Sequence, residues 1–228
     1  MKISLCLIVQ NELQGCKTDV PNLPRHAFDE MFAIDGGSTD GTVEYLTGLG
    51  IRVHRQRKPG LNAAYVDANE IATGDAVVVY FPKGTLPAAD VLKFRPLFEQ
   101  GYDLVIASRQ VTGSRNEEDL HLLKPRKWAV RALALAAALV WRREGPWVRD
   151  VLHGFKGWRR PAFARMKVLD VGLSIDIEMV VRAYKLRLPR IEFPTTETSR
   201  GYGKTHFKFW PTGKRLLQYL WFELRRHD

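Results

Sequence analysis

The strongest indication of the fold is the sequence Ile34-Asp35-Gly36-Gly37-Ser38-Thr39-Asp40-Gly41-Thr42. It has the pattern of a strand end, a carboxylate, a flexible turn and a helix start with Ser, Thr and Asp available as caps. A carboxylate at a strand end can accept a hydrogen bond from a base N–H or a ribose hydroxyl. An ordinary capped turn between a strand and a helix has the same pattern, so spacing alone leaves both interpretations open.

Short apolar runs alternate with helical stretches around this turn. Strands separated by helices indicate βαβ units and a mainly parallel sheet. Ligands of such sheets bind at the carboxyl ends of the strands. Function is therefore expected in the loops after Val9, Ile34, Phe81 and Ser108. We expect strands at 3–9, 30–34, 51–55, 76–81 and 104–108, and helices at 39–48, 61–73 and 88–100.

The second half of the chain differs in composition. The formal net charge of +10 predicts anionic partners, and the positive charge is concentrated from Lys124 onward. No linker separates this half from the first. We expect helices at 128–141, 174–186 and 211–226, a mixed segment at 148–160, a short strand at 190–194 and a basic loop at 198–208.

The cysteines and the N-terminus exclude some classes of protein. The two cysteines, Cys6 and Cys16, show neither a CxxC pair nor a Cys/His ligand spacing, so a zinc site is not expected. Their number suits a reducing compartment. Residues 1–9 are too short for a secretory signal and are expected to form the first strand. No segment offers the roughly 20 apolar residues of a membrane span.

Four segments of the first half resemble the family-two glycosyltransferases with the GT-A fold. Residues 34–42 resemble their Asp-Asp-Gly-Ser-Thr-Asp-Gly-Thr motif, and Asn11-Glu12 resembles the Asn-Glu pair of the first strand. Residues 58–64 with 72–75 resemble the Lys-x-Gly-x-x-x-Ala…Ala-x-Gly-Asp stretch, and 105–109 the Val-x-Gly-Ser-Arg strand. The resemblance implies a Rossmann-like α/β fold, with a mainly parallel sheet flanked by helices.

Three segments of the second half resemble the polyprenol-phosphate sugar transferases, such as dolichol-phosphate mannose synthases. Residues 149–156 are similar to Arg-Asp-x-x-Ser-Gly-Phe-Arg, 176–178 to an Asp-x-Glu helix, and 200–205 to a slightly shifted Arg-x-x-Gly-x-Ser-Lys. This resemblance implies one continuous domain. Residues 1–125 would form the nucleotide-sugar-binding half, and 126–228 an acceptor-binding half with C-terminal amphipathic interface helices.

The resemblance also implies roles for individual residues. Lys83, Asp150 and Arg109 would form the catalytic set, with Asp150 near the donor sugar and the acceptor. Arg109, Arg200 and Lys204 would receive the acceptor phosphate. A lipid phosphate is already anionic at neutral pH, so it needs cationic orientation more than a general base. Contacts with the nucleotide sugar are expected from Val9, Asn11, Glu12, Asp35, Gly37, Ser38, Asp40, Gly60 and Lys83.

One departure from the family pattern concerns the metal. The family carries Asp-x-Asp at the end of the fourth strand, where it holds Mg²⁺ or Mn²⁺ against the donor diphosphate. Here Phe81-Pro82-Lys83 stands in its place, without the carboxylates that a divalent site needs. Three interpretations remain open. In the first, Lys83 replaces the charge of the metal and no cofactor is needed. In the second, another carboxylate such as Asp75 or Asp90 binds Mg²⁺ or Mn²⁺. In the third, the protein binds nucleotide sugars poorly or not at all.

Apolar stretches flanked by cations predict contact with a membrane. The run 128–141 would be about 20 Å long as a helix, too short to cross a bilayer. Its tryptophans at both ends and its flanking cations suit an anionic membrane interface, although a buried core helix has the same pattern. The stretches 206–210 and 216–222 offer a second such element. We expect a cytoplasmic protein that binds peripherally to the inner face of a membrane.

The leading hypothesis is an inverting, hexosyltransferase-type enzyme that transfers a sugar from a nucleotide-diphosphate sugar to a polyprenyl phosphate. A GT-A enzyme acting on a glycan hydroxyl, such as a lipid-linked glycan, is an alternative. It would need a general base, for which His153, Asp176 and Glu178 are candidates. A non-catalytic protein that binds nucleotide sugar or lipid phosphate is a further alternative. Nucleic acid is not an expected partner, because no recognisable binding module is present.

Overall fold

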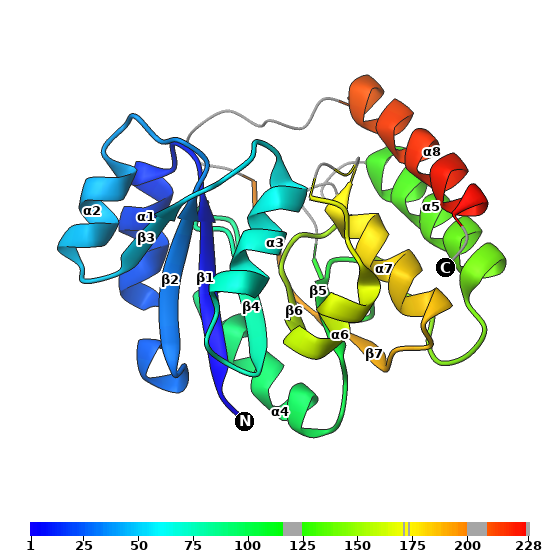
Figure 1. Ribbon diagram of the computed structural model, residues 1–228, viewed down its shortest axis with the longest axis horizontal. Coiled ribbons are helices and arrows are strands. Elements are labelled where there is room, and N and C mark those ends of the chain that lie inside the picture. Colours follow the sequence, from blue (N-terminus) through cyan, green and yellow to red (C-terminus); the bar gives the residue numbers. More distant parts are fainter. Residues whose placement is uncertain (116–124, 171, 173, 200–208, 227–228) are drawn as a thin grey trace.

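A computed structural model describes residues 1–115, 125–170, 172, 174–199 and 209–226 of this chain. Within these residues a seven-stranded sheet forms the centre of the molecule, with the strand order β3-β2-β1-β4-β6-β5-β7 (Figure 1). Neighbouring strands are parallel except at β6, which runs antiparallel to both β4 and β5. The mainly parallel α/β sheet predicted from the sequence is confirmed.

The bounds of the elements follow the apolar runs of the sequence. The strands are β1 (Ile3–Val9), β2 (Glu30–Asp35), β3 (Arg52–Arg55), β4 (Ala76–Tyr80), β5 (Leu104–Ser108), β6 (Lys156–Arg159) and β7 (Arg190–Pro194). The helices are α1 (Leu13–Asp19), α2 (Thr42–Gly48), α3 (Leu61–Ile71), α4 (Phe94–Glu99), α5 (Pro125–Trp141), α6 (Arg160–Met166), α7 (Ile175–Lys185) and α8 (Phe209–Arg225). Short 3₁₀ helices lie at Val20–Asn22, Arg25–Ala27 and Ala88–Lys93.

Helices cover both faces of the sheet because successive strand side chains point to opposite faces. In β1, Cys6 and Ile8 join the core beneath α3, α6 and α7, whereas Leu5 and Leu7 join the core beneath α1, α2 and α4. All seven residues of β1 are buried. A central strand that is buried on both faces explains the unbroken apolar run at the start of the sequence.

Three details differ from the sequence expectations. The expected helix at 88–100 is a 3₁₀ helix followed by α4, because Pro96 is tolerated only in the first turn of an α-helix. The mixed segment at 148–160 contains β6, and helices α1 and α6 were not expected. Because β6 lies between β4 and β5, the two halves of the chain share one sheet.

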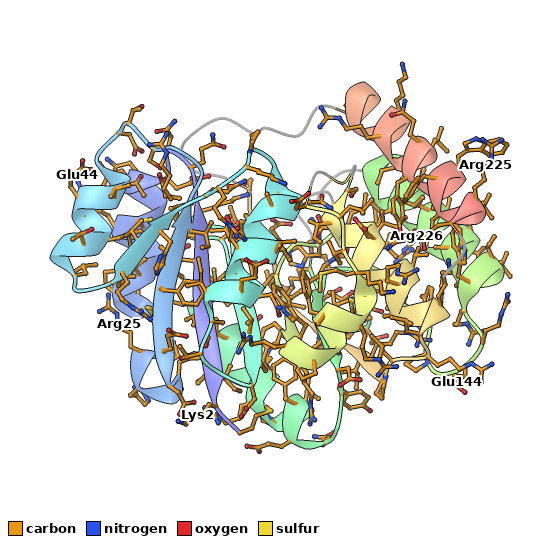
Figure 2. The ribbon with its side chains drawn as sticks, viewed as in Figure 1. Lys2, Arg25, Glu44, Glu144, Arg225 and Arg226 are labelled. Carbon is orange, nitrogen blue, oxygen red and sulfur yellow. The ribbon has the colours of Figure 1, made fainter. Side chains whose placement is uncertain are left out.

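Helices α5 and α8 lie at one side of the molecule and both pack against α7 (Figure 1). Glu223 of α8 accepts hydrogen bonds from Arg182 and Lys185 of α7, both at 3.1 Å. Figure 2 shows Arg225 extending outward from α8, while Arg226 turns inward, where it donates to the Lys167 carbonyl at 2.8 Å. Among the described residues, no helix has the length and apolar character needed to cross a membrane.

Candidate active site

The predicted site residues gather at one edge of the sheet. The parallel strands end at this edge, so the loops after β1, β2, β4 and β5 meet there. Because β6 is antiparallel, the segment that precedes it, residues 150–155, comes to the same edge. The topology therefore places Glu12, Asp35, Lys83, Arg109 and Asp150 in loops at this edge.

Hydrogen bonds join the loop after β1 to the loop after β2. The Asp35 carboxylate accepts from the backbone N–H of Gly37 at 2.9 Å and of Ser38 at 3.0 Å, and from the Ser38 hydroxyl. Asn11 donates its backbone N–H to Ser38 Oγ at 2.9 Å, and its side-chain oxygen accepts from the Thr39 N–H at 2.8 Å. The turn is thus fixed, with Gly37 at a φ of 100° that favours glycine.

A second set of contacts ties these loops to the start of α2. Asp40 accepts from the backbone N–H of Thr42 at 3.1 Å and of Leu13 at 3.0 Å. Burial acts to raise the pKa of Asp40, but hydrogen bonds from Thr42 and Leu13 outweigh it and lower that pKa. The Glu12 N–H donates to the Thr42 hydroxyl at 3.1 Å. Glu12 and Asp35 are both buried, and Val9 is buried within β1.

The turn after β4 carries an aromatic ring and an ammonium group in place of two carboxylates. Phe81 packs against Gly154, where a Cβ would lie only 2.7 Å from the ring. The Lys83 Nζ lies 4.8 Å from the centre of the Phe81 ring, a cation–π distance. Phe81 therefore fills space against the segment before β6, and Lys83 is the charged side chain of the turn.

Contacts from α1 hold this turn in place. Asp19 accepts from the Gly84 N–H at 2.8 Å and from the Tyr80 hydroxyl at 3.2 Å. Burial raises the pKa of Asp19, although these hydrogen bonds oppose the shift. A Cβ at Gly15 would lie 2.0 Å from the Pro82 carbonyl oxygen, so only glycine allows α1 to approach so closely. The fold therefore builds a defined turn around Lys83.

The side chains of this turn do not fit a divalent cation. Mg²⁺ and Mn²⁺ take oxygen ligands, whereas Phe81 offers a ring and Lys83 a positive charge. No group of three His, Cys, Asp or Glu side chains suited to a metal occurs among the described residues. Asp75 cannot substitute, because it precedes β4 at the opposite edge, where it accepts the N–H of Lys2 at 2.8 Å. Figure 2 shows Lys2 at this opposite edge. Asp90 is engaged by Lys93 and by the Thr195 hydroxyl.

Arg109 and the buried Asp150 form an ion pair on the other side of the edge. The Asp150 carboxylate accepts from the Arg109 Nε, Nη2 and backbone N–H, each at 2.9 Å. Burial alone would raise the pKa of Asp150, but the charge and hydrogen bonds of Arg109 outweigh it and hold that pKa well below its usual range. Asp150 is thus an ionised carboxylate whose hydrogen-bonding capacity is largely used by Arg109.

Two further carboxylates join this cluster, and the sequence analysis missed both. Glu197 accepts from the Arg109 Nη1 at 2.7 Å. Glu192 accepts the backbone N–H groups of Arg149 at 2.7 Å and Asp150 at 2.9 Å. Neither Glu lies in a recognised motif, so only the pairing of β7 with β5 shows that they reach this edge.

The three candidate bases are all engaged within the protein. His153 is buried with Nδ1 on the Ala107 carbonyl, and burial together with Arg109 lowers its pKa. Asp176 pairs with the buried Lys156 at 3.0 Å. Glu178 accepts from Asn62 at 2.9 Å, and burial raises its pKa to about 7. These side chains support the fold around the site.

Of the remaining predicted residues, the structure describes Gly60 but neither Arg200 nor Lys204. Gly60 directly precedes α3 with a φ of 103°, and Asn62 in the first turn of α3 links this region to Glu178. Arg200 and Lys204, predicted to bind phosphate, lie outside the described residues. Their roles, like those of the other predicted contact residues, stay predictions.

Comparison with known families assigns this architecture. Residues 4–166 match the family model described as Glycosyl transferase family 2. The chain belongs to glycosyl transferase family 2. The match spans the sheet from β1 to β6 with the loops at its carboxyl edge, so the resemblance inferred from short motifs is confirmed.

Two named glycosyltransferases match most of this chain. Glycosyltransferase AglJ of Haloferax volcanii is 27% identical over 203 residues, which cover 88% of this chain and 65% of that protein. Dolichol-phosphate mannosyltransferase of Pyrococcus furiosus is 24% identical over 233 residues, which cover 96% of this chain and 62% of that protein. The chain thus spans less than two thirds of the length of these relatives.

A solved structure supports the fold of this family-two chain. Glucosyl-3-phosphoglycerate synthase from Mycobacterium tuberculosis, in complex with Mn²⁺, UDP and phosphoglyceric acid, superposes with a TM-score of 0.71 at 17% identity. The superposition covers 100% of this chain and 80% of that one. The likeness confirms the predicted GT-A fold. That protein binds Mn²⁺, whereas this chain carries Phe81 and Lys83 at the end of β4.

Proposed function

We propose that this chain transfers a sugar from a nucleotide-diphosphate sugar to a polyprenyl phosphate at a membrane surface, with inversion and without a divalent metal ion. The observation that carries the proposal is the placement of two cationic side chains, Lys83 and Arg109, in loops at the same edge of a family-two sheet. In this reaction a phosphate oxygen attacks C1 of the sugar. The bond from C1 to the diphosphate breaks, and the nucleoside diphosphate leaves.

On the donor side, the loops that contain Glu12 and Asp35 hold the nucleotide, and Lys83 faces the diphosphate. A fixed ammonium group stabilises the negative charge that develops on the leaving diphosphate. Support comes from the rigid construction of the turn, which Asp19 fixes through the Gly84 N–H. Further support comes from the position of Lys83 after β4, where the family places its metal ligands.

On the acceptor side, a phosphate monoester suits the chemistry better than a hydroxyl. A hydroxyl must lose a proton, yet His153, Asp176 and Glu178 are each occupied by partners within the protein. A phosphate needs no base, and the Arg109 guanidinium offers directed N–H donors for it. The name of the Pyrococcus relative, dolichol-phosphate mannosyltransferase, agrees with this acceptor class.

Exposed apolar side chains on α5 and α8 support the membrane part of the proposal. On α5, the exposed residues Trp128, Leu135 and Leu139 follow one face at helical spacing, and Leu139 is 74% exposed. On α8, Leu217 and Trp221 are exposed to 68% and 58%. Cationic side chains flank this surface at Lys127, Arg142, Arg143, Lys214, Arg215 and Arg225.

This arrangement matches an anionic bilayer. Apolar side chains enter the interface between headgroups and acyl chains, while Lys and Arg stay at the level of the phosphates. Burial of these apolar groups in the bilayer is favourable, and each cation near an anionic surface adds about 1 kcal/mol. The acceptor lipid would then reach the protein from the bilayer on which α5 and α8 lie.

A transfer assay tests the proposal. The protein is incubated with radiolabelled UDP-, GDP- or TDP-sugars and with vesicles that contain undecaprenyl phosphate or undecaprenol, each with Mg²⁺ or with EDTA. We expect label in the lipid only with the phosphate, and at similar rates in both buffers. Label in undecaprenol alone would identify a hydroxyl acceptor. Nucleotide-sugar binding without transfer to either lipid would favour the non-catalytic alternative, and transfer only with Mg²⁺ would overturn metal independence.

A further inference from the structure

The Arg109 guanidinium donates hydrogen bonds to two carboxylates that differ in solvent exposure. Its Nε and Nη2 donate to Asp150, whose side chain is fully buried. Its Nη1 donates at 2.7 Å to Glu197, whose side chain is 24% exposed. Asp150 therefore holds the inner side of Arg109, and Glu197 covers the side that solvent can reach.

The charges of this cluster oppose the binding of an anion. Burial acts to raise the pKa of Glu197, but the charge of Arg109 outweighs it and lowers that pKa, so Glu197 is ionised at neutral pH. Two carboxylates on one guanidinium leave a net charge of −1. A phosphate dianion that approaches Arg109 meets the Glu197 carboxylate first, and the two negative charges repel.

We propose that the Glu197 carboxylate holds the place of the acceptor phosphate on Arg109 and leaves it when a phosphate monoester binds. This inference rests on the proposed function, because it specifies how that acceptor enters the site. A phosphate dianion carries more charge and more acceptor oxygens than a carboxylate, so it makes the stronger contact with an Arg fork. While the acceptor is absent, Glu197 satisfies a partly buried N–H donor that would otherwise lack a partner.

The segment that carries Glu197 links both sides of the site. The Thr195 N–H donates to the Ser108 carbonyl at 3.0 Å, and the Glu197 N–H donates to the Arg115 carbonyl at 3.0 Å. The Thr198 N–H then donates to the Thr85 carbonyl at 2.9 Å, two residues beyond Lys83. We expect the departure of Glu197 from Arg109 to loosen this segment, which is tied to the Lys83 turn.

Binding measurements on a charge-neutral variant test this inference. Glu197→Gln keeps the shape of the side chain and an acceptor oxygen, but it removes the competing charge. We expect farnesyl phosphate in detergent micelles to bind this variant about tenfold more tightly than the wild type by calorimetry. Farnesol and inorganic phosphate are the matched probes, because they separate the contribution of the lipid from that of the phosphate. Glu70→Gln neutralises a carboxylate on α3 that pairs with Arg57, and it should leave the affinity for farnesyl phosphate unchanged.

Hydrogen exchange on the wild type gives a second readout that needs no variant. If phosphate displaces Glu197, farnesyl phosphate should speed the exchange of the Glu197 and Thr198 amides, which are hydrogen-bonded without the ligand. Slower exchange there, together with unchanged or weaker binding by Glu197→Gln, would overturn the displacement while leaving the acceptor class intact. If wild type and variant bind a nucleotide sugar but no farnesyl phosphate, the acceptor class itself is wrong.

Discussion

The ends of β4 and β5 hold their cations in different surroundings. After β4, where the family carries two carboxylates, this chain places Lys83 over an aromatic ring. After β5, where a cation is expected for the acceptor, Arg109 is enclosed by Asp150 and Glu197. In the proposed function, Lys83 serves the donor side, whereas the guanidinium on the acceptor side stays bound to carboxylates until a ligand competes for it.

In the proposed function, this arrangement lets one edge serve two anionic substrates. A guanidinium that is held by carboxylates does not bind free phosphate without discrimination, because an incoming anion must compete with them. The Arg109 guanidinium is bound by two carboxylates, one of which solvent can reach. Variants at four places test this arrangement and the function built on it.

Removal of Asp150 should have the largest effect on the acceptor side. Asp150→Ala removes the inner partner of the partly buried Arg109 and leaves it with Glu197 alone, which costs about 3 kcal/mol of unfolding free energy. Urea unfolding measures this loss. Asp75→Ala at the opposite edge removes a carboxylate that accepts only a backbone N–H in an exposed contact, so it should cost under about 1 kcal/mol. Equal losses in the two variants would contradict the pairing.

On the donor side, Lys83→Ala should weaken the binding of nucleoside diphosphate about a hundredfold, because a charge-assisted contact with the diphosphate is lost. Titration calorimetry in EDTA measures the change. Lys93→Ala is the matched control, since Lys93 also lies over an aromatic ring, 5.4 Å from the centre of Phe193, but away from the turn. If the two variants bind UDP and GDP equally, Lys83 does not face the diphosphate.

Loss of exposed apolar side chains on α5 and α8 should weaken binding to membranes. The double variant Leu139→Ser and Leu217→Ser should bind vesicles of anionic lipid at least about tenfold more weakly, because both side chains are exposed on α5 and α8. Vesicle flotation measures the partition. Leu92→Ser changes an exposed leucine near the opposite core and should have no effect. Equal flotation of all three proteins would show that α5 and α8 do not contact the bilayer.

The smallest expected effect concerns pH. Burial raises the pKa of Glu178 in the folded state to about 7, above its unfolded value near 4.5. The folded state therefore holds this proton more tightly, and its stability falls as pH rises from the unfolded toward the folded pKa. Relative to Glu178→Gln, the wild type should lose roughly 1 kcal/mol of unfolding free energy between pH 6 and pH 8. A difference that stays constant with pH, or rises, would mean that Glu178 is ionised throughout this range.

The sequence predicted the fold well where patterns are local. β1, β5 and β7 were expected with their observed bounds. For β1 and β5 the reason is that a fully buried strand leaves an apolar run of the same length. β6 was not recognised, because its four residues, Lys-Gly-Trp-Arg, carry cations at both ends. Its glycine is required by tertiary contact, since a Cβ at Gly157 would lie 2.8 Å from both Phe94 and Phe98. No local pattern reports such a contact.

The sequence predicted which loops carry the candidate site, but not which side chains contact each other there. The motifs placed Asp35, Lys83 and Arg109 at strand ends, and the topology brings these ends to one edge. Neither the bond from Glu197 to Arg109 nor the support of the Lys83 turn by Asp19 was foreseen. These partners are separated by 88 and 65 residues along the chain, and only the assembled sheet brings each pair together.

In the proposed function, a fixed ammonium group takes the place of a metal ion on the donor side. Calorimetric titration of the wild type with UDP-, GDP- and TDP-sugars, in EDTA and in Mg²⁺, tests this substitution. We expect one nucleotide sugar to bind with the same affinity in both buffers, and Lys83→Ala to weaken this binding about a hundredfold. Binding that requires Mg²⁺, and that is unchanged in Lys83→Ala, would show that Lys83 does not replace a metal ion.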